Sequence, residues 1–199
     1  MGFSLNANAK KLRILAYGDS LTAGYRLSST QAYPAQLEAL LKKRGFEVEI
    51  VNAGVSGDTS ADALKRLDWS LSRGPYDWVL LCIGANDGLR SLPVAAMKRN
   101  ISEILEKLKS KGAKVLLVGM KMPTNLSPVY RREFEETYKN LAQQHKVSFY
   151  GFLLDGVATN ASLNLMDQIH PNENGYKVIS ERLADFLMKD KKFTSSLNR

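Results

Sequence analysis

Short apolar segments alternate with amphipathic stretches along this chain, and this alternation restricts its fold more than any other feature. The segment 78–83 (WVLLCI) is apolar throughout, as expected for a parallel strand that is buried on both faces. The segment 46–52 (FEVEIVN) alternates apolar and charged residues, which is typical of a half-exposed strand at a sheet edge. The predicted strands are 12–17, 46–52, 78–83, 114–120 and 147–150.

Amphipathic segments with apolar residues at helical spacing separate or follow these strands. The predicted helices are 33–44, 60–72, 93–112, 127–145 and 173–189. Strands that alternate with helices predict a three-layer α/β/α sandwich around a five-stranded parallel sheet. Because the chain has 199 residues and no internal repeat or linker, we expect a single domain over 1–199, with its core at about 12–190.

The net charge of +8 comes mainly from residues 98–146, which hold 11 Lys and Arg against five Asp and Glu. Most of these basic residues alternate with Glu at helical spacing, as they do on solvated helix faces. We favour that interpretation over a nucleic-acid-binding surface, because neither an RNA-binding strand with interleaved aromatics nor a basic recognition helix accompanies the charge. We therefore expect no nucleic-acid partner.

Composition argues against several other classes of protein. One Cys excludes internal disulfides and a cysteine-based zinc site, and two His leave little room for a histidine-rich metal centre. No apolar run reaches the ~18 residues of a transmembrane helix, so we expect no stable membrane anchor. Residues 1–11 lack the apolar region of an intact signal peptide. We expect a periplasmic or secreted protein if a signal was removed, and a cytoplasmic one otherwise.

Four polar loops, three of which contain glycine, follow predicted strands or precede the last predicted helix. Right-handed crossovers bring the loops after parallel strands to one edge of the sheet, where ligands of open α/β sheets bind. We therefore expect these four loops to form a reaction site. They are 18–25 (GDSLTAGY), 52–58 (NAGVSGD), 84–88 (GANDG) and 167–172 (DQIHPN).

The side chains in these loops fit acyl transfer. A serine hydroxyl needs a base within hydrogen-bond reach, and the chain offers only His145 and His170. His145 ends a predicted helix, where we interpret it as a surface cap on the last carbonyl groups. His170 follows Asp167 by three residues, so the carboxylate could orient one ring nitrogen while the other faces a nucleophile.

An acyl-transfer site also needs donors for the oxyanion that forms. The backbone N–H groups of Ser20 and Gly57 and the side-chain amide of Asn86 are candidates, although each could be an ordinary turn residue on its own. Ser56 lies in a near match to the G-x-S-x-G nucleophile motif, but that match ends in Asp, so Ser56 is not favoured as the nucleophile. Cys82 lies within a strand and is interpreted as a small buried hydrophobic residue.

The four loops, taken in order, resemble the sequence blocks of the SGNH (GDSL) hydrolase superfamily. The strings GDSLTAGY, VSGDTSADALKRL, ANDGLR and DQIHPNENGY are similar to its small bacterial arylesterase, thioesterase and lysophospholipase branch, and the resemblance covers about 12–189. It implies the flavodoxin-like SGNH form of the sandwich and a serine ester hydrolase that needs no metal or organic cofactor. One departure is Ala85, which adds a methyl group where that branch commonly has glycine.

The resemblance also implies roles for individual residues. Ser20 would be the nucleophile, His170 the base and Asp167 the residue that orients it. The oxyanion hole would consist of Ser20, Gly57 and Asn86. The loops 89–92 and 121–126 would line the acyl pocket. The candidate substrate contacts are Asp19, Leu89, Met122 and Pro123.

Two other hypotheses remain at this point. The first is a Mg²⁺-dependent phosphoesterase that binds its metal through Asp19, Asp87 and Asp167. The second is a non-catalytic module that binds a small ligand in the same crevice. The sequence also leaves open the acyl-chain length, the preference among esters, thioesters and lysophospholipids, and the oligomeric state.

Overall fold

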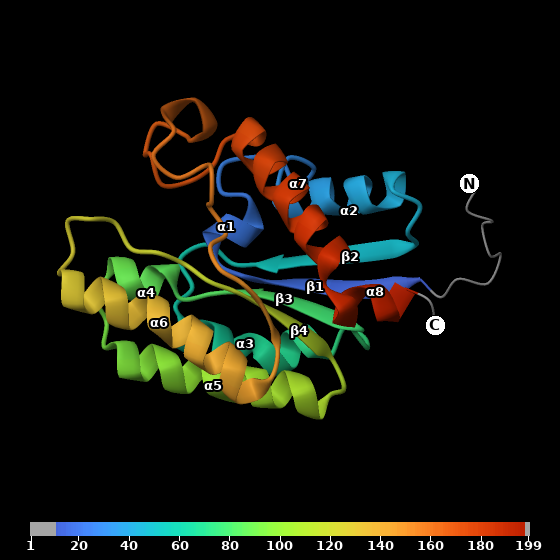
Figure 1. The fold of residues 1–199 in the computed structure, drawn as a ribbon, viewed down its shortest axis with the longest axis horizontal. Coiled ribbons are helices and arrows are strands. Elements are labelled where there is room, and N and C mark those ends of the chain that lie inside the picture. The colour runs from blue at the N-terminus through green and yellow to red at the C-terminus, as the bar shows by residue number, and fades with distance from the viewer. Residues whose placement is uncertain (1–10, 198–199) are drawn as a thin grey trace.

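A five-stranded parallel sheet forms the centre of the molecule (Figure 1). The computed structural model describes residues 11–197. The strand order is β2-β1-β3-β4-β5, and every neighbouring pair is parallel, as the sequence predicts. The strands are β1 (Leu12–Gly18), β2 (Val48–Gly54), β3 (Trp78–Cys82), β4 (Lys114–Val118) and β5 (Ser148–Tyr150).

Helices cover both faces of this sheet and complete the three layers (Figure 1). On one face α2 packs against α7, and on the other α5 packs against both α3 and α6. The longer helices are α2 (Tyr33–Lys43), α3 (Ser60–Leu71), α5 (Val94–Ser110), α6 (Pro128–His145) and α7 (Glu173–Lys189). The shorter ones are α1 (Ser20–Ala23), α4 (Ala85–Leu89), the 3₁₀ turn η1 (Ala161–Leu163) and α8 (Lys191–Leu197).

The positions of the strands follow from their hydrophobic patterns. β3 is the middle strand and all five of its residues are buried, as its continuous apolar run predicts. β2 is an edge strand in which the buried Val48 and Ile50 alternate with the more exposed Glu49 and Val51, as the pattern of this segment predicts. The N–H of Ile50 donates to the Glu38 carboxylate of α2 at 2.6 Å, which satisfies a backbone group on this edge strand.

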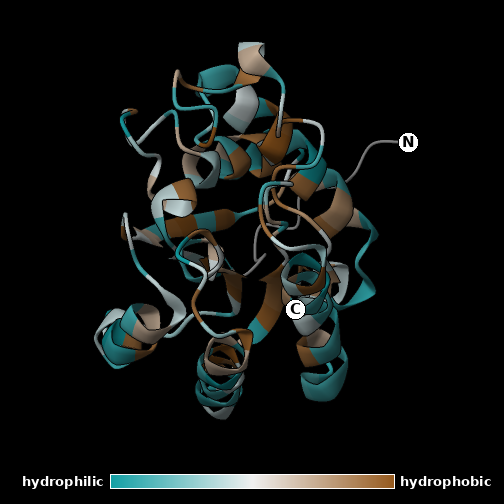
Figure 2. Cartoon of the chain, turned by 90° about the vertical axis from the view of Figure 1, so that its left-hand side faces the viewer, coloured by the Kyte–Doolittle hydropathy of each residue, from teal (hydrophilic) through white to brown (hydrophobic). Residues whose placement is uncertain are grey.

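Apolar and charged residues are segregated between the sheet and the outer helix faces. Figure 2 views the carboxyl edge of the sheet and shows hydrophobic residues along the strands and hydrophilic residues on the outward turns of the helices. On α5, Ile101 and Leu105 are buried while Lys98 and Arg99 are exposed. The basic residues of α5 therefore lie on a solvated face, as predicted. In residues 11–197, no helix combines the length and apolar character that crossing a membrane requires.

Two very short helices at the carboxyl edge are not predicted from the sequence. α1 begins two residues after β1 and α4 begins three residues after β3. They have four and five residues, too few to produce a helical hydrophobic pattern. Gly54 at the end of β2 allows α1 to pack closely, because a Cβ at Gly54 would lie 2.2 Å from the backbone nitrogen of Ala23.

The sheet order places a topological switch at β1. From β1 the chain passes to β2 on one side, and then returns past β1 to β3, β4 and β5 on the other. The loops that follow β1 and β3 therefore diverge, and open α/β sheets bind ligands in the crevice at such a point. Both α1 and α4 begin there, so residues of these two helices border the crevice.

Candidate active site

Ser20 is the first residue of α1 and lies two residues after the end of β1. Its neighbour Asp19 caps this helix by accepting a hydrogen bond from the N–H of Leu21 at 3.0 Å. A residue at the first helical position has no acceptor for its N–H within the helix. Ser20 therefore presents both its hydroxyl group and its N–H at the carboxyl edge of the sheet, and the residue is partly exposed.

His170 connects Ser20 to Asp167. Its Nε2 lies 2.9 Å from Ser20 Oγ, and its Nδ1 lies 2.9 Å from Asp167 Oδ2. A carboxylate only accepts hydrogen bonds, so Nδ1 donates to Asp167 and the neutral ring presents Nε2 as an acceptor for the Ser20 hydroxyl. Three side chains that the sequence separates by up to 150 residues are thus arranged as a continuous relay.

The turn from Asp167 to His170 prepares the carboxylate for this contact. Asp167 Oδ1 accepts from the N–H groups of Ile169 at 2.9 Å and His170 at 3.0 Å, while Gln168 between them has a left-handed φ of 56°. Partial burial by itself raises the pKa of Asp167, but the two backbone N–H groups and the His170 ring outweigh it and lower the pKa to about 2. Asp167 is therefore ionised at neutral pH.

The three candidate oxyanion donors come from three different loops at this edge. Gly57 is exposed and has a φ of 89°, a left-handed conformation that favours glycine. The Asn86 side-chain nitrogen donates to the carbonyl oxygen of Asp58 at 2.9 Å. This bond uses one of the two amide hydrogens and fixes the orientation of the other. The contact therefore joins the loop after β3 to the loop after β2.

Known proteins resemble this chain over most of its length. The model of the GDSL-like lipase/acylhydrolase family matches residues 16–178. The chain belongs to this family. An arylesterase of Vibrio mimicus is 33% identical over 177 residues, covering 89% of this chain and 88% of that protein. Esterase TesA of Pseudomonas aeruginosa is 36% identical over 167 residues, covering 84% and 83%.

Solved structures give the same result for the fold. A crystal structure of TesA superposes with a TM-score of 0.85 at 34% identity and covers 89% of this chain and 98% of that one. The SGNH-hydrolase family esterase AlinE4 gives a TM-score of 0.76 at 38% identity, covering 95% and 97%. The protein is thus a hydrolase of the SGNH (GDSL) group with the flavodoxin-like sandwich that the sequence predicts.

Two of the four candidate substrate contacts of this GDSL hydrolase are buried. Asp19 is only 1% exposed, and burial raises the pKa of its carboxyl group to about 7. Met122 is 7% exposed and packs against α4, where a Cβ on Gly88 would lie 2.1 Å from its sulfur. Asp19 and Met122 therefore present little surface at this edge of the sheet. Leu89 and Pro123 are exposed.

The prediction for His145 is wrong. His145 is 6% exposed, and its Nε2 lies 2.8 Å from the Ser102 hydroxyl of α5. Burial lowers the pKa of the ring. It therefore joins α5 to α6 inside the protein and does not cap the helix end on the surface. Lys146, which has a left-handed φ of 55°, forms that cap.

The three carboxylates of the Mg²⁺ hypothesis, those of Asp19, Asp87 and Asp167, each accept hydrogen bonds from different groups. The buried Asp87 carboxylate accepts from the N–H of Ser60 at 2.7 Å and from its hydroxyl at 2.6 Å, which ties α4 to the start of α3. Asp19 and Asp167 bind the backbone of their own turns. Across residues 11–197, no group of three or more His, Cys, Asp or Glu side chains is arranged to hold a metal ion.

Three other residues that the sequence analysis considers are Cys82, Ser56 and Ala85. Cys82 is 1% exposed, and burial raises the pKa of its thiol well above the usual value, which confirms its interpretation as a buried hydrophobic residue. Ser56 is exposed beside Gly57. The extra methyl group of Ala85 is buried, because Ala85 is 7% exposed.

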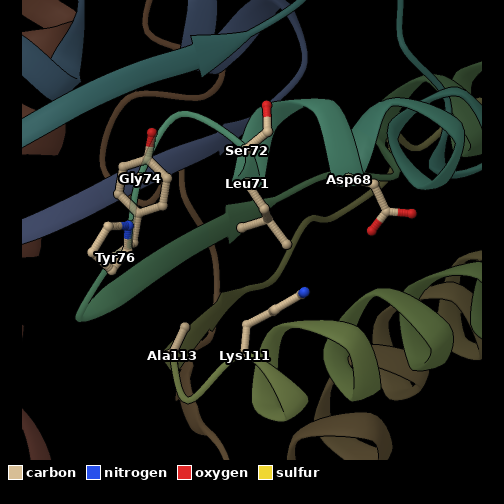
Figure 3. A pocket seen from close by; sticks show the side chains of 8 residues that line it. Asp68, Leu71, Ser72, Gly74, Tyr76, Lys111 and Ala113 are labelled. Carbon is tan, nitrogen blue, oxygen red and sulfur yellow. The ribbon is translucent and has the colours of Figure 1, made fainter.

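A cavity of about 500 Å³ lies away from this site (Figure 3). It is lined by Asp68 and Leu71 near the end of α3, by Tyr76 before β3, and by Lys111 and Ala113 before β4. Because the strands are parallel, residues that precede strands lie at the edge opposite Ser20, which follows β1. The cavity is therefore separate from the relay of Ser20, His170 and Asp167.

Two contacts beside the site are not predicted from the sequence. The Tyr25 ring lies against the His170 ring, with the centroids 4.4 Å apart. The Arg66 guanidinium binds both Asp58 and the carbonyl oxygen of Gly18. Tyr25 and Arg66 lie within strings that resemble the family. Asp58 lies only eight residues before Arg66, but His170 and Gly18 lie far from Tyr25 and Arg66 along the chain, and the fold brings them together.

Proposed function

We propose that this hydrolase cleaves carboxylic esters and thioesters through an acyl-enzyme on Ser20. The observation that carries the proposal is the relay in which His170 lies 2.9 Å from both the Ser20 hydroxyl and the Asp167 carboxylate. A serine hydroxyl is a weak nucleophile, and a neighbouring imidazole that accepts its proton overcomes this weakness. Asp167 keeps the ring in the required tautomer and stabilises the imidazolium that forms.

The reaction has two halves. Ser20 Oγ attacks the substrate carbonyl carbon while its proton moves to His170 Nε2, and a tetrahedral intermediate forms. When the carbonyl re-forms, the bond to the alcohol or thiol breaks, and His170 returns the proton to this leaving group. Water then attacks the acyl-enzyme with His170 again as the base, which releases the carboxylic acid and restores Ser20.

The oxyanion of each tetrahedral intermediate would be held by Ser20 N–H, Gly57 N–H and the Asn86 amide. In the described part of the chain, the N–H groups of Ser20 and Gly57 have no hydrogen-bond partner, so both remain available. Preorganised donors of this kind act only on charge that develops in the transition state, and removing one typically lowers the rate by about 10²–10³-fold.

Exposed apolar side chains beside the relay support an acyl substrate. Met166 and Ile169 flank Asp167 along the chain, and Leu89 follows Asn86 at the end of α4. Their exposed fractions are 101%, 47% and 42%. The choice of esters and thioesters also agrees with the relatives, which are named as an arylesterase, an esterase, and a thioesterase 1/protease 1/lysophospholipase L1.

The proposal is tested by covalent labelling together with turnover. A fluorophosphonate should add once per chain, on Ser20, and Ser20→Ala should abolish labelling and lower kcat/KM for nitrophenyl esters by at least about 10⁴-fold. Ser56→Ala is the matched control and should label like the wild type. Labelling that persists in Ser20→Ala would exclude this nucleophile.

Substrate preference needs a separate measurement. A nitrophenyl ester series from acetate to palmitate, run beside a panel of acyl-coenzyme A thioesters, should show turnover in both classes. Activity should be unchanged by EDTA, because the proposed steps use only side chains and water. Loss of activity in EDTA that Mg²⁺ restores would favour the phosphoesterase hypothesis instead.

A further inference from the structure

We propose that Arg66 of α3 is a positioning residue for the oxyanion hole, because its guanidinium holds the loop that carries Gly57 against the strand end that leads to Ser20. Arg66 does not reach the reacting atoms in this proposal and acts only through the groups that it holds. The inference rests on the proposed acyl-transfer function, since the relative position of these N–H groups matters only when an oxyanion forms.

Few backbone hydrogen bonds restrain the loop that contains Gly57, although the Arg90 guanidinium donates to the Gly57 carbonyl oxygen at 3.0 Å. It follows β2, which is an edge strand with no neighbour on its outer side. Val55, Ser56 and Gly57 are all exposed. The backbone bonds that hold the loop are Val55 N–H to the Gly18 oxygen at 3.0 Å and Asp58 N–H to the Val55 oxygen at 3.2 Å. Side chains must therefore supply much of its rigidity.

Arg66 contacts both sides of the site with different parts of one guanidinium. Its Nε donates to the Asp58 carboxylate at 2.5 Å, and one terminal nitrogen donates to the Gly18 carbonyl oxygen at 2.9 Å. Gly18 is the last residue of β1, two positions before Ser20. Asp58 directly follows Gly57. The planar fork of arginine thus spans the distance between the two backbone segments.

The guanidinium is itself fixed in position. It lies over the Tyr17 ring at 4.3 Å from the centroid, and the Tyr17 hydroxyl donates to the Ala63 carbonyl oxygen of α3. The exposed fractions of the Arg66 and Asp58 side chains are 18% and 11%. Water therefore has little access to the ion pair, and charge-assisted bonds in such surroundings are the strong ones.

Asp58 extends the effect to the third donor. Its carboxylate binds Arg66, while its carbonyl oxygen accepts the hydrogen bond that orients the Asn86 amide. A shift of Asp58 would therefore move the Gly57 N–H and the Asn86 amide together. Arg66 is connected to all three candidate donors, through Gly18 to Ser20 and through Asp58 to Gly57 and Asn86.

Arg66→Lys tests the proposal because it keeps the charge and the aliphatic stem but removes the planar fork. We expect kcat for nitrophenyl acetate to fall about 10–100-fold and KM to change less than about threefold, since oxyanion donors act in the transition state. Asp58→Asn alters the other partner of the ion pair with Arg66 and should show the same selective loss in kcat. Arg182→Lys on α7, which alters an ion pair with Asp155, is the control and should match the wild type.

A double-mutant cycle with Asn86→Ala separates this role from a general loss of structure. If Arg66 acts through the oxyanion hole, the effect of Arg66→Lys on kcat should shrink at least about threefold when Asn86 is already absent. The proposal would be overturned if the losses in kcat of the two single variants simply multiply in the double variant. It would also be overturned if the kcat of Arg66→Lys stays within twofold of the wild type. Ser20→Ala is measured in parallel. If that variant stays active, the proposed function has failed, whereas an inactive Ser20→Ala beside an unaffected Arg66→Lys rejects only the role of Arg66.

Discussion

Asp19 directly precedes Ser20, yet its carboxyl group is enclosed by the protein. One oxygen accepts the N–H of Leu21, while Oδ2 has no hydrogen-bond partner and is buried. Burial, followed by repulsion from Asp58 and Asp87, raises its pKa to about 7, although the Leu21 N–H opposes this shift. The residue therefore shapes the start of α1 while keeping its proton well above the usual pH range for a carboxyl group.

We predict that Asp19 makes the stability of the protein depend on pH. Between about pH 4 and 7 the folded chain keeps a proton on Asp19 that the unfolded chain releases, so the free energy of unfolding falls as pH rises through this window. Asp19→Asn keeps an oxygen that can cap α1 but removes the ionisation. Urea denaturation should show that the stability of Asp19→Asn relative to the wild type increases from pH 4 to pH 8. A constant difference over that range would contradict the prediction.

The sequence identifies the relay residues better than it identifies their surroundings. With only two His in the chain, the short spacing from Asp167 to His170 distinguishes one of them without any knowledge of the fold. The burial of His145 was not predictable, because its partner Ser102 lies on another helix. The same reason applies to Asp19 and Met122, since their burial depends on elements that pack over them after folding.

At the scale of elements, α8 closes the amino edge of the sheet. Phe193 is fully buried and packs edge-on against Trp78 at 5.3 Å between ring centroids. The Trp78 indole N–H donates to the Ser196 hydroxyl at 3.1 Å, and the Lys114 ammonium donates to the same oxygen at 2.7 Å. Both Trp78 and Lys114 begin strands, so α8 anchors the starts of β3 and β4.

We predict that Phe193→Ala lowers stability without changing catalysis. Truncating a fully buried Phe costs about 3–5 kcal/mol in the free energy of unfolding, and this side chain lies at the edge opposite Ser20. Chemical denaturation should show that loss, while kcat for nitrophenyl acetate stays within twofold of the wild type where both proteins are folded. Phe193→Leu keeps most of the volume and should lose less. A loss below 1 kcal/mol for the alanine variant would show that α8 contributes little.

Long elements could be predicted from the sequence and short ones could not. Every strand has an apolar run or an alternation, and α5 repeats its apolar positions over 17 residues. α1, α4 and α8 have four, five and seven residues, so their patterns contain too few repeats to be recognised. Ser20 lies in α1 and Asn86 in α4. Because these helices are so short, the sequence predicts loops at positions where the structure has the first turns of helices.

At the scale of the whole molecule, the candidate site and the contacts of α8 lie at opposite edges of one sheet. The carboxyl edge holds the relay of Ser20, His170 and Asp167 and the exposed side chains of Leu89, Met166 and Ile169. The amino edge holds the buried contacts of α8 and Trp78. The buried residues between them form one continuous hydrophobic core that includes side chains from all five long helices.

We predict from this continuous core that the chain behaves as a single domain. Differential scanning calorimetry should show one transition whose calorimetric and van't Hoff enthalpies agree. Near-ultraviolet circular dichroism and intrinsic fluorescence should follow the same curve. These signals come partly from Trp78 in the core and from Trp69, which is 60% exposed on α3, and both surroundings are lost together when a single domain unfolds. Two separate transitions would divide the chain into independent units.

The position of the amino edge has a practical consequence. β1 starts and α8 ends on the same side of the molecule, on the right in Figure 1, while α1, which begins with Ser20, lies toward the other side. A solid support or a fused reporter attached beside the start of β1 or the end of α8 would leave Ser20 facing away from the attachment. The topology of the sheet thus favours these two positions for immobilised use.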